Sequence, residues 1–280
     1  MTAGTAHALK FSNGVECNFN GQNISEELTD DPATAVFRIE VRSFVLQVDG
    51  LNVLVDSCCG NGKTRSVPWA HQLQTDWLQA LGRTGLSPAD IHLVLCTHLH
   101  VDHVGWNTRL ENGKWVPTFP NARYVMSRTD HDHWADVAKR PGSVPFEVNT
   151  YNDSVLPIVE ARMAEFVSGD HAMCGCLVLK PTPGHTPGQI RLDLDSRGKR
   201  AIFAGDALHN PVQVPLWKWN SVFCEDRDMA RRSRQKLLAD CVEQGALLMP
   251  AHFASPHAAY IKANGDRFEL DWDHDNARGR

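Results

Sequence analysis

The sequence has no long apolar run and no excess of positive charge. No stretch of the 280 residues approaches the roughly 18 uninterrupted apolar residues that a membrane-spanning helix needs. Lys and Arg number 28 against 33 Asp and Glu, so the net charge is −5 and the basic surface of a nucleic-acid binder is not expected. A hydrophobic fraction of 42% with 22% charged residues excludes a disordered or fibrous chain. The composition predicts a globular protein with a sizeable core.

Signals for secretion and for separate domains are also missing. Residues 1–10 lack a basic stretch followed by an apolar one, so we expect no leader peptide and a cytoplasmic protein. No repeat, low-complexity tract or Gly/Ser linker divides the chain, and we predict a single domain over residues 1–280. The eight cysteines include adjacent Cys58 and Cys59, and we expect mostly reduced, buried thiols rather than a disulfide framework.

Short apolar runs predict a layered fold of mixed strands and helices. Runs at residues 36–39, 44–48 and 53–55, with Asp49-Gly50 as a turn, indicate a hairpin-rich sheet. Further strands are expected at 93–95, 176–179, 201–203 and 246–249, and each ends in polar residues. Functional groups of layered α/β proteins commonly collect at such strand ends. The sequence therefore predicts an α/β (α+β) protein whose site lies at one edge of its sheets.

Two helices are expected between these strands. Apolar residues at helical spacing from Trp69 to Leu81, closed by Gly82 and Gly85, predict an amphipathic helix that packs on the sheet. Helix formers over residues 228–244 predict a second helix that ends at Gly245. Its basic run is expected on the solvent-facing side and consists of Arg231, Arg232, Arg234 and Lys236.

Histidine is unusually abundant, with 14 residues against three tyrosines, and its densest cluster follows the strand at 93–95. There His98, His100, Asp102 and His103 occupy six residues. Imidazoles and carboxylates suit Zn, Fe or Mn, and the lack of a nearby cysteine favours an open catalytic site over a closed structural zinc site. A helical segment would align His98 with Asp102, and an extended one would align His98, His100 and Asp102. Either geometry leaves ligands for two ions.

Three further candidate ligands stand at the ends of later strands. His185 lies in the turn Pro-Gly-His-Thr-Pro-Gly, Asp206 follows Gly205, and His252 follows Pro-Ala. Each alone has an ordinary explanation as a turn, capping or surface residue. Their combination with the first cluster, always at strand ends, predicts seven ligands for two divalent metal ions.

In this order the motifs resemble the metallo-β-lactamase-fold superfamily, whose pattern is His-x-His-x-Asp-His followed by a distant His, a Gly-Asp and a last His. The resemblance covers roughly residues 36–252 and implies an αβ/βα four-layer sandwich of two mixed sheets flanked by helices. It also implies the ligand sets: His98, His100 and His185 on one ion, Asp102, His103 and His252 on the other, and Asp206 bridging both. Asp56 matches an early aspartate that orients the ligands instead of binding metal.

Within the superfamily, residues 205–213 and 250–253 resemble the branch that contains methyl parathion hydrolase and lactonase-like enzymes. True β-lactamases lack the bridging aspartate, the glyoxalase II branch favours Gly-Gly where this chain has Gly105-Trp106, and flavodiiron-type proteins replace the histidine at position 100 with a carboxylate. The RNA-processing branch usually adds a further domain, and the net charge does not favour it. The resemblance therefore implies a metal-dependent hydrolase of the lactonase-like branch.

The chemistry implied is hydrolysis of a small ester-type bond by a water that two cations share and acidify. A lactone is the first choice of substrate, and an aryl ester or a phosphotriester comes next. The ions are expected to be zinc, with manganese and iron as alternatives. By the resemblance, Asp102 carries a proton to the leaving alkoxide. The alternatives are a glyoxalase II-like thioester hydrolase and a non-catalytic metal-binding protein.

Five residues are expected to contact the small-molecule substrate: Trp106, His209, Trp217, Trp219 and Phe223. The last three could equally be core residues or contacts in a homodimer, and His209 could instead hydrogen-bond a ligand. Neither nucleic acid nor a membrane is expected as a partner. Two motifs are given ordinary roles. The pair His131 and His133 is placed at a helix start on the surface or at the mouth of the pocket, and a soft-metal site at residues 174–176 is disfavoured because no other thiol cluster is near.

Overall fold

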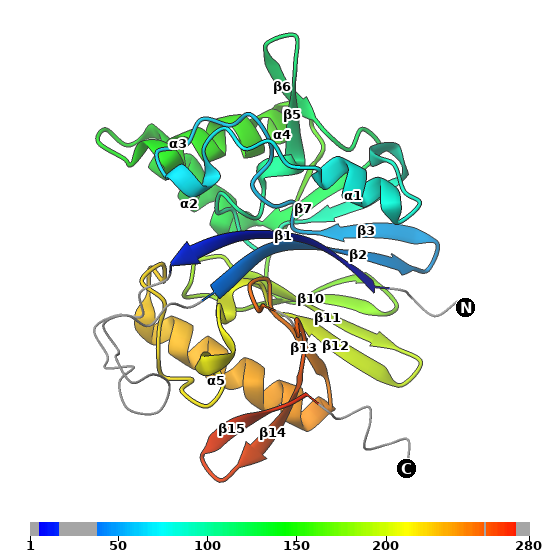
Figure 1. The fold of residues 1–280 in the computed structure, drawn as a ribbon, viewed down its shortest axis with the longest axis vertical. Helices are drawn as coiled ribbons and strands as arrows, with labels where there is room; N and C mark the ends of the chain where they lie inside the picture. Colours follow the sequence, from blue (N-terminus) through cyan, green and yellow to red (C-terminus); the bar gives the residue numbers. More distant parts are fainter. Residues whose placement is uncertain (1–5, 17–37, 255, 273–280) are drawn as a thin grey trace. The chain divides into compact units, whose positions relative to one another are not determined.

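The computed structural model describes residues 6–16, 38–254 and 256–272 (Figure 1). The contacts of the chain divide it into two compact units, one made of Met1–Phe11 and Val41–Pro181 and the other of Ser12–Glu40 and Thr182–Arg280. The expectation of a single domain remains a prediction. Among the described residues, no helix combines the length and the hydropathy that crossing a membrane requires.

A mixed sheet runs in the order β1-β2-β3-β4-β7-β8, and the first unit contains all of it except the end of β1 and the start of β2 (Figure 1). Its strands are β1 (Ala6–Glu16), β2 (Arg38–Val48), β3 (Leu51–Val55), β4 (Leu93–Leu95), β7 (Arg123–Ser127) and β8 (Ala164–Val167). β2 and β3 pair antiparallel across Asp49-Gly50, as predicted, whereas β3, β4, β7 and β8 run parallel. Part of the run predicted at 36–39 lies outside the described residues. Because β3 and β4 are parallel, their carboxyl ends meet at one edge of the sheet.

Helices and two hairpins complete the first unit. The helices are α1 (Trp77–Arg83), α2 (Arg128–Lys139), α3 (Pro145–Thr150), the π-helical η5 (Tyr151–Val155) and α4 (Leu156–Glu160). The 3-10 turns are η2 (Pro68–Ala70), η3 (Pro88–Asp90) and η4 (Gly105–Asn107). The hairpins pair β5 (Thr108–Glu111) with β6 (Lys114–Pro117), and β9 (His171–Cys174) with β10 (Leu177–Pro181).

The helix predicted from Trp69 to Leu81 is only partly correct. α1 begins at Trp77, and residues 68–70 form the separate turn η2. Gln72 between them has a positive φ of 50°, which a continuous right-handed helix does not allow. Trp77 and Leu81 are fully buried, and Trp69 and Leu73 still pack against the same core from the loop. The apolar spacing therefore predicted correctly which residues are buried, but its prediction of one continuous helix was wrong.

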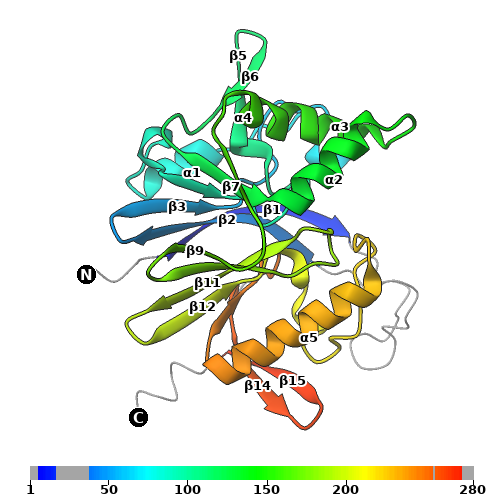
Figure 2. The same ribbon diagram turned by 180° about the vertical axis from the view of Figure 1, so that it is seen from behind.

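The second unit holds the later strands and the longest helix. It contains β11 (Ile190–Ser196), β12 (Lys199–Phe203), β13 (Leu247–Met249), the hairpin β14 (Tyr260–Asn264) and β15 (Arg267–Asp271), and α5 (Arg227–Gln244). Its 3-10 turns are η6 (Gly205–Ala207) and η7 (Pro211–Gln213). β12 pairs antiparallel with β11 and parallel with β13, and α5 connects β12 to β13 (Figure 2). These mixed sheets with flanking helices confirm the predicted fold class.

Helix α5 confirms the prediction for residues 228–244, with one correction. Gly245 ends it in the left-handed conformation, and Leu237, Leu238 and Cys241 are buried in the core of the unit. Arg234, which we expected on the solvent-facing side, is fully buried. The prediction that all four basic residues face solvent was wrong because a helix turns about 100° per residue, so neighbouring cations cannot all lie on one face. Arg232 and Lys236 are exposed, as expected.

Candidate metal centre

The histidine cluster after β4 lies in a loop of turns, so neither the helical nor the extended alternative holds. Asp130 in the first turn of α2 secures this loop, because its Oδ2 accepts a hydrogen bond from the backbone N–H of Leu99 at 2.9 Å. Asp130 is completely buried. His98 and His103 are also buried, whereas His100 and Asp102 are partly exposed. The loop therefore has a fixed base and a more open side.

Gly105 lets this loop lie directly on the segment that follows β3. Its backbone N–H donates to the Cys58 carbonyl at 2.6 Å. A Cβ atom at this position would lie 1.9 Å from the backbone carbon of Cys59, so no other residue fits without displacing the chain. The glycine that ends the His-rich motif is thus a packing requirement.

Asp56 is hydrogen-bonded to two residues of the first-unit loop, and the orienting role that the resemblance implies for it remains a prediction. Its Oδ1 accepts from the Thr97 N–H and its Oδ2 from the Thr97 hydroxyl, both at 2.8 Å. The same Oδ2 lies 2.9 Å from Nδ1 of His103. Because a carboxylate accepts, Nδ1 of His103 carries a proton, and Nε2 faces the Asp102 carboxylate at 3.6 Å. A cation or a proton between Nε2 and the carboxylate would satisfy both groups.

His98 is held in the same way. The Thr97 hydroxyl donates to Asp56, so its oxygen is an acceptor for Nδ1–H of His98 at 3.2 Å. Nε2 of His98 then carries a lone pair and lies 3.1 Å from Nδ1 of His100. Two nitrogens on a tetrahedral zinc with bonds of about 2.05 Å lie about 3.3 Å apart. The spacing of this pair fits a shared ion.

In the second unit, His185 sits in a turn fastened to the start of α5. The backbone N–H groups of Glu225 and Asp226 donate to the carbonyls of His185 and Gly184 at 3.1 and 3.0 Å. Gly184 has a φ of 127°, and a Cβ there would lie 2.1 Å from the backbone nitrogen of Ala230. The glycine before His185 is therefore required by the close approach of the helix.

Asp206 follows β12 and is the centre of the second-unit cluster. Its carboxylate lies 3.0 Å from Nε2 of His252 and 3.3 Å from Nε2 of both His185 and His209. All four side chains are buried. The carboxamide oxygen of Gln189 accepts from the backbone N–H of Asp206 and so fixes the turn that carries it. One carboxylate among three imidazoles is a donor set suited to a divalent ion.

The tautomer of His252 strengthens this assignment. Its Nδ1 lies 2.7 Å from the carbonyl oxygen of Glu40, which can only accept, so the proton is on Nδ1. Nε2 then faces the Asp206 carboxylate at 3.0 Å. This repeats the arrangement of His103 and Asp102 in the first unit. The residues present therefore fit a bound metal in both clusters.

His209, predicted to contact the substrate, is buried within the second-unit cluster. Its ring stacks on His252 with centroids 5.4 Å apart and planes 12° apart, and it is almost fully buried. Burial lowers the pKa of His209, so the ring is neutral near pH 7. Its ring nitrogens make no hydrogen bond among the described residues. His185, Asp206 and His209 together form one of the clusters whose donor atoms lie within 4.8 Å of one another.

The aromatic residues predicted as substrate contacts have different surroundings. Trp106 is buried in the core of the first unit and stacks on Trp77 at 5.7 Å, a packing role that accounts for it without a substrate. Trp217 and Trp219 are partly buried in the second unit. Phe223 is 43% exposed, and its ring centroid lies 6.1 Å from that of His209. Of the four, Phe223 is the one beside the ligand cluster.

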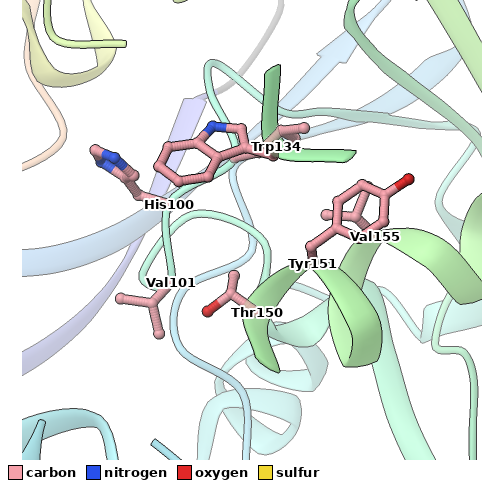
Figure 3. A pocket seen from close by; sticks show the side chains of 7 residues that line it. His100, Val101, Trp134, Thr150, Tyr151 and Val155 are labelled. Carbon is pink, nitrogen blue, oxygen red and sulfur yellow. The ribbon is translucent and has the colours of Figure 1, made fainter. Parts of the chain in front are cut away.

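A small pocket in the first unit opens beside His100 (Figure 3). Its lining is mostly apolar: Leu99, His100, Val101, Trp134, Thr150, Tyr151 and Val155. The ring of Trp134 meets that of His100 edge to face at 5.3 Å. Sequence reasoning placed the 131–133 pair at a helix start, which is confirmed, but missed Trp134 and Tyr151 because apolar residues within helical segments resemble ordinary core.

The chain belongs to the metallo-beta-lactamase superfamily, whose model matches residues 38–271. It is 28% identical over 198 residues to the uncharacterized protein YobT of Bacillus subtilis (strain 168), a match that covers 68% of this chain and 76% of that protein. It is 25% identical over 125 residues to the N-acyl homoserine lactonase of Bacillus thuringiensis, which covers 44% of this chain but only 40% of the lactonase.

A solved structure of AidC, a dizinc quorum-quenching lactonase in complex with a product, has a similar fold. The two align with a TM-score of 0.70 at 21% identity, over 84% of this chain and 79% of AidC. At this identity the likeness supports the fold alone. Family membership confirms the resemblance drawn from the sequence.

Proposed function

We propose that the protein is a metal-dependent hydrolase of small ester-type bonds, with a lactone as the favoured substrate and an aryl ester or phosphotriester as the next choices. Its ligands are the seven residues that the sequence predicts, and two divalent ions, zinc first, are its cofactor. Those residues are His98, His100, Asp102, His103, His185, Asp206 and His252. The lactonase relative and the dizinc lactonase with a similar fold support this choice.

The observation that carries the proposal is that, in both clusters, an imidazole Nε2 faces a carboxylate while Nδ1 is held by another protein group. Nε2 of His103 faces Asp102, and Nε2 of His252 faces Asp206. Nδ1 of His103 lies against Asp56, and Nδ1 of His252 lies against the Glu40 carbonyl. A divalent cation between each Nε2 and its carboxylate would be bound by both groups, and it would offset the negative charge that is buried there. The clusters are therefore best explained as metal ligands.

When bound, the two ions supply a Lewis acid for the substrate oxygen and lower the pKa of water. The chain's own residues do the rest. Asp102 is partly exposed, so its carboxylate can accept a proton from the attacking water and pass it to the leaving oxygen. His209, neutral and buried beside Asp206, offers a ring nitrogen to the substrate or to a metal. Asp56 and Asp130 keep the first cluster in place.

The pocket beside His100 supports an apolar substituent on the substrate. Its walls are formed by Trp134, Tyr151 and Val155, and the phenol of Tyr151 lies 3.3 Å from Nε2 of His131. An apolar group that enters it is removed from water next to a metal ligand, and each buried methylene contributes about 0.8 kcal/mol. We therefore expect acyl or alkyl esters to bind better than hydrophilic ones.

The test is metal analysis of the purified protein, coupled to rates on lactones, aryl esters, phosphotriesters and acyl-glutathione thioesters. We expect at least two zinc equivalents per chain, activity lost on chelation and restored by zinc, and the highest kcat/KM on lactones. A preference for thioesters would replace the lactonase assignment with the glyoxalase II-like alternative. Full metal content with no turnover on any class would favour the non-catalytic alternative.

A substitution in the pocket beside His100 tests whether this pocket binds the apolar chain of the substrate. Trp134→Ala should raise KM more for a long-chain than for a short-chain lactone while leaving metal content unchanged, because only the long chain fills the pocket. Trp272→Ala, an exposed tryptophan of the second unit, is the matched control. An equal change in KM for both chain lengths would remove the pocket from the proposal.

A further inference from the structure

A second type of ligand cluster lies in the first unit, where two thiols and a carboxylate meet. Cys174 ends β9, and Cys176 lies in the turn before β10. Their Sγ atoms are 3.4 Å apart. Asp49, in the β2–β3 turn, is 127 positions from Cys176, and its Oδ2 lies 3.5 Å from that Sγ. The register of the hairpin β9–β10 is irregular between Leu177 and Val178.

This cluster is separate from the histidine loop. Asp49 stands just before β3 and Asp56 just after it, and five strand residues at about 3.3 Å each separate the two by roughly 17 Å or more. The β2–β3 turn is thus at the opposite end of the strand from the metal ligands (Figure 1). Asp49 is exposed and both cysteines are partly exposed, so a cation in solution can reach all three.

The spacing of the three atoms matches the edges of a tetrahedral metal site. With Zn–S bonds of about 2.3 Å and a Zn–O bond of about 2.0 Å, two sulfurs lie about 3.8 Å apart and a sulfur and an oxygen about 3.5 Å apart. The observed distances are 3.4 and 3.5 Å. The donor atoms of all three residues lie within 4.8 Å of one another. Only a small shift of one thiol is needed to hold an ion.

The charges of the cluster favour a cation as well. Burial raises the pKa of the Cys176 thiol to about 12 because it disfavours the charged thiolate, and the neighbouring Cys174 and Asp49 raise it as well. A divalent ion offsets the repulsion between the anionic forms of these groups and replaces the thiol protons, since a metal-bound thiol is deprotonated. The other described cysteines are buried: Cys58, Cys59, Cys96, Cys224 and Cys241.

We propose that Cys174, Cys176 and Asp49 form a separate binding site for a thiophilic divalent cation of the Zn²⁺ and Cd²⁺ class, with water in the fourth position. Binding converts two thiols and one carboxylate into three ligands and releases two protons. The ion joins the β2–β3 turn to the β9–β10 hairpin. Because these turns are far apart in sequence, the link stabilises the folded first unit over the unfolded chain.

The probe is Cd²⁺ added to zinc-loaded, reduced protein, because thiolate ligation of Cd²⁺ gives a near-ultraviolet charge-transfer band that imidazole and carboxylate ligands do not give. We expect one Cd²⁺ equivalent per chain with this band. Cys174→Ser and Cys176→Ser should each abolish the band and lower the bound metal by one equivalent. Asp49→Asn should weaken Cd²⁺ binding about tenfold.

Two controls separate this site from other thiols and carboxylates. Asp170→Asn removes an exposed carboxylate that precedes β9 and should leave the affinity unchanged. Cys224→Ala removes the thiol 3.9 Å from Nδ1 of His185 and should leave the band unchanged. A band that disappears with Cys224→Ala and persists in Cys176→Ser would overturn the proposal.

Cys174 and Cys176 could instead form a disulfide. Mass analysis after thiol alkylation distinguishes this disulfide from two free thiols. Protein purified without reductant is alkylated, digested and analysed for the peptide that contains residues 174–176. If this peptide carries an internal disulfide and the reduced protein then takes up no Cd²⁺, the metal site does not exist. Circular dichroism of each variant verifies that the fold is retained, so that a lost band reports on binding.

Discussion

Three of the proposed ligand histidines have one ring nitrogen held by another protein group and the other directed at the candidate metal cluster. Asp56 fixes His103, the Thr97 hydroxyl fixes His98, and the Glu40 carbonyl fixes His252. Such partners set the tautomer and the ring orientation before metal arrives, which reduces the entropy lost on binding. The residues that fix the rings are as much a part of the site as the rings themselves.

Asp102 is the residue through which we test proton transfer. Asp102→Asn keeps an oxygen for metal ligation but cannot carry a proton, so kcat should fall by about 10²–10⁴-fold. The assay is run with excess zinc, and metal analysis verifies full occupancy. Asp132→Asn, an exposed carboxylate on α2, is the control and should keep parent turnover. Parent-like turnover of fully loaded Asp102→Asn would remove the proton-carrying role.

At the scale of elements, α5 fixes both the His185 turn and the segment after Asp206. The Ser233 hydroxyl donates to the Pro183 carbonyl at 2.6 Å, next to the required glycine at 184. Arg234 donates to the carbonyls of Ala207, Trp217 and Trp219 at 2.6–2.7 Å. One helix therefore positions two parts of the second-unit cluster.

Gly184→Ala tests the close approach of the His185 turn to α5. The new Cβ would collide with the backbone of Ala230, and φ is already positive, so the free energy of unfolding should fall by about 2–3 kcal/mol. Zinc affinity should fall with it. Gly198→Ala, in the β11–β12 turn, has a positive φ but open space around it and should cost only about 1 kcal/mol. Equal losses in the two variants, measured by urea unfolding, would contradict the role given to the contact.

Arg234→Met tests the buried guanidinium. The substitution leaves three carbonyls without their donor, and each unpaired buried group costs about 1–3 kcal/mol, so we expect a loss of about 3 kcal/mol in unfolding free energy. Arg232→Met, on the exposed side of α5, should change it by less than about 0.5 kcal/mol. Denaturant titration of both variants measures the difference, and similar values would show that Arg234 contributes no more than a surface residue.

At the scale of the whole molecule, a buried lysine makes stability depend on pH. Lys63 donates to the Thr108 hydroxyl at 2.8 Å and lies 3.3 Å from Asp153, which also pairs with Arg65 at 2.6 Å. Its ammonium lies over the ring of Trp115. Burial lowers the pKa of Lys63 to about 7, although Asp153 opposes the shift. The ordinary pKa of lysine, about 10.4, applies to the unfolded chain.

Between pH 7 and 10 the unfolded chain thus binds more protons at Lys63 than the native state, so this residue makes stability rise with pH in that window. The parent should gain about 2 kcal/mol more than Lys63→Met between pH 7 and 9, as measured by urea unfolding at both pH values. Lys199→Met, at the exposed start of β12, should keep the parent slope. An unchanged slope in Lys63→Met would mean that the ammonium stays charged in the native state.

Much of this molecule could be predicted where local pattern and local chemistry coincide. The Asp49-Gly50 turn, the strand at 93–95 and the end of α5 at Gly245 follow from turn residues and apolar runs that act on their immediate neighbours. The candidate ligands of the first cluster could be recognised because four of them fall within six residues. The prediction for Arg234 was wrong because a helix turns about 100° per residue, so that it lies on the buried side of α5. The helix predicted from Trp69 was wrong because the positive φ of Gln72 interrupts it, although its apolar residues are in the core.

The sequence by itself determined the superfamily, the class of fold and the candidate ligands, because these depend on residue types at fixed spacing and on the periods of strands and helices. Only the tertiary structure decided which ring nitrogens carry protons, that His209 lies beside Asp206, and that Asp49 meets the two thiols of the β9–β10 hairpin. The reason is physical: tautomers, burial and metal-ligand distances are set by groups that are remote along the chain and meet only when it folds.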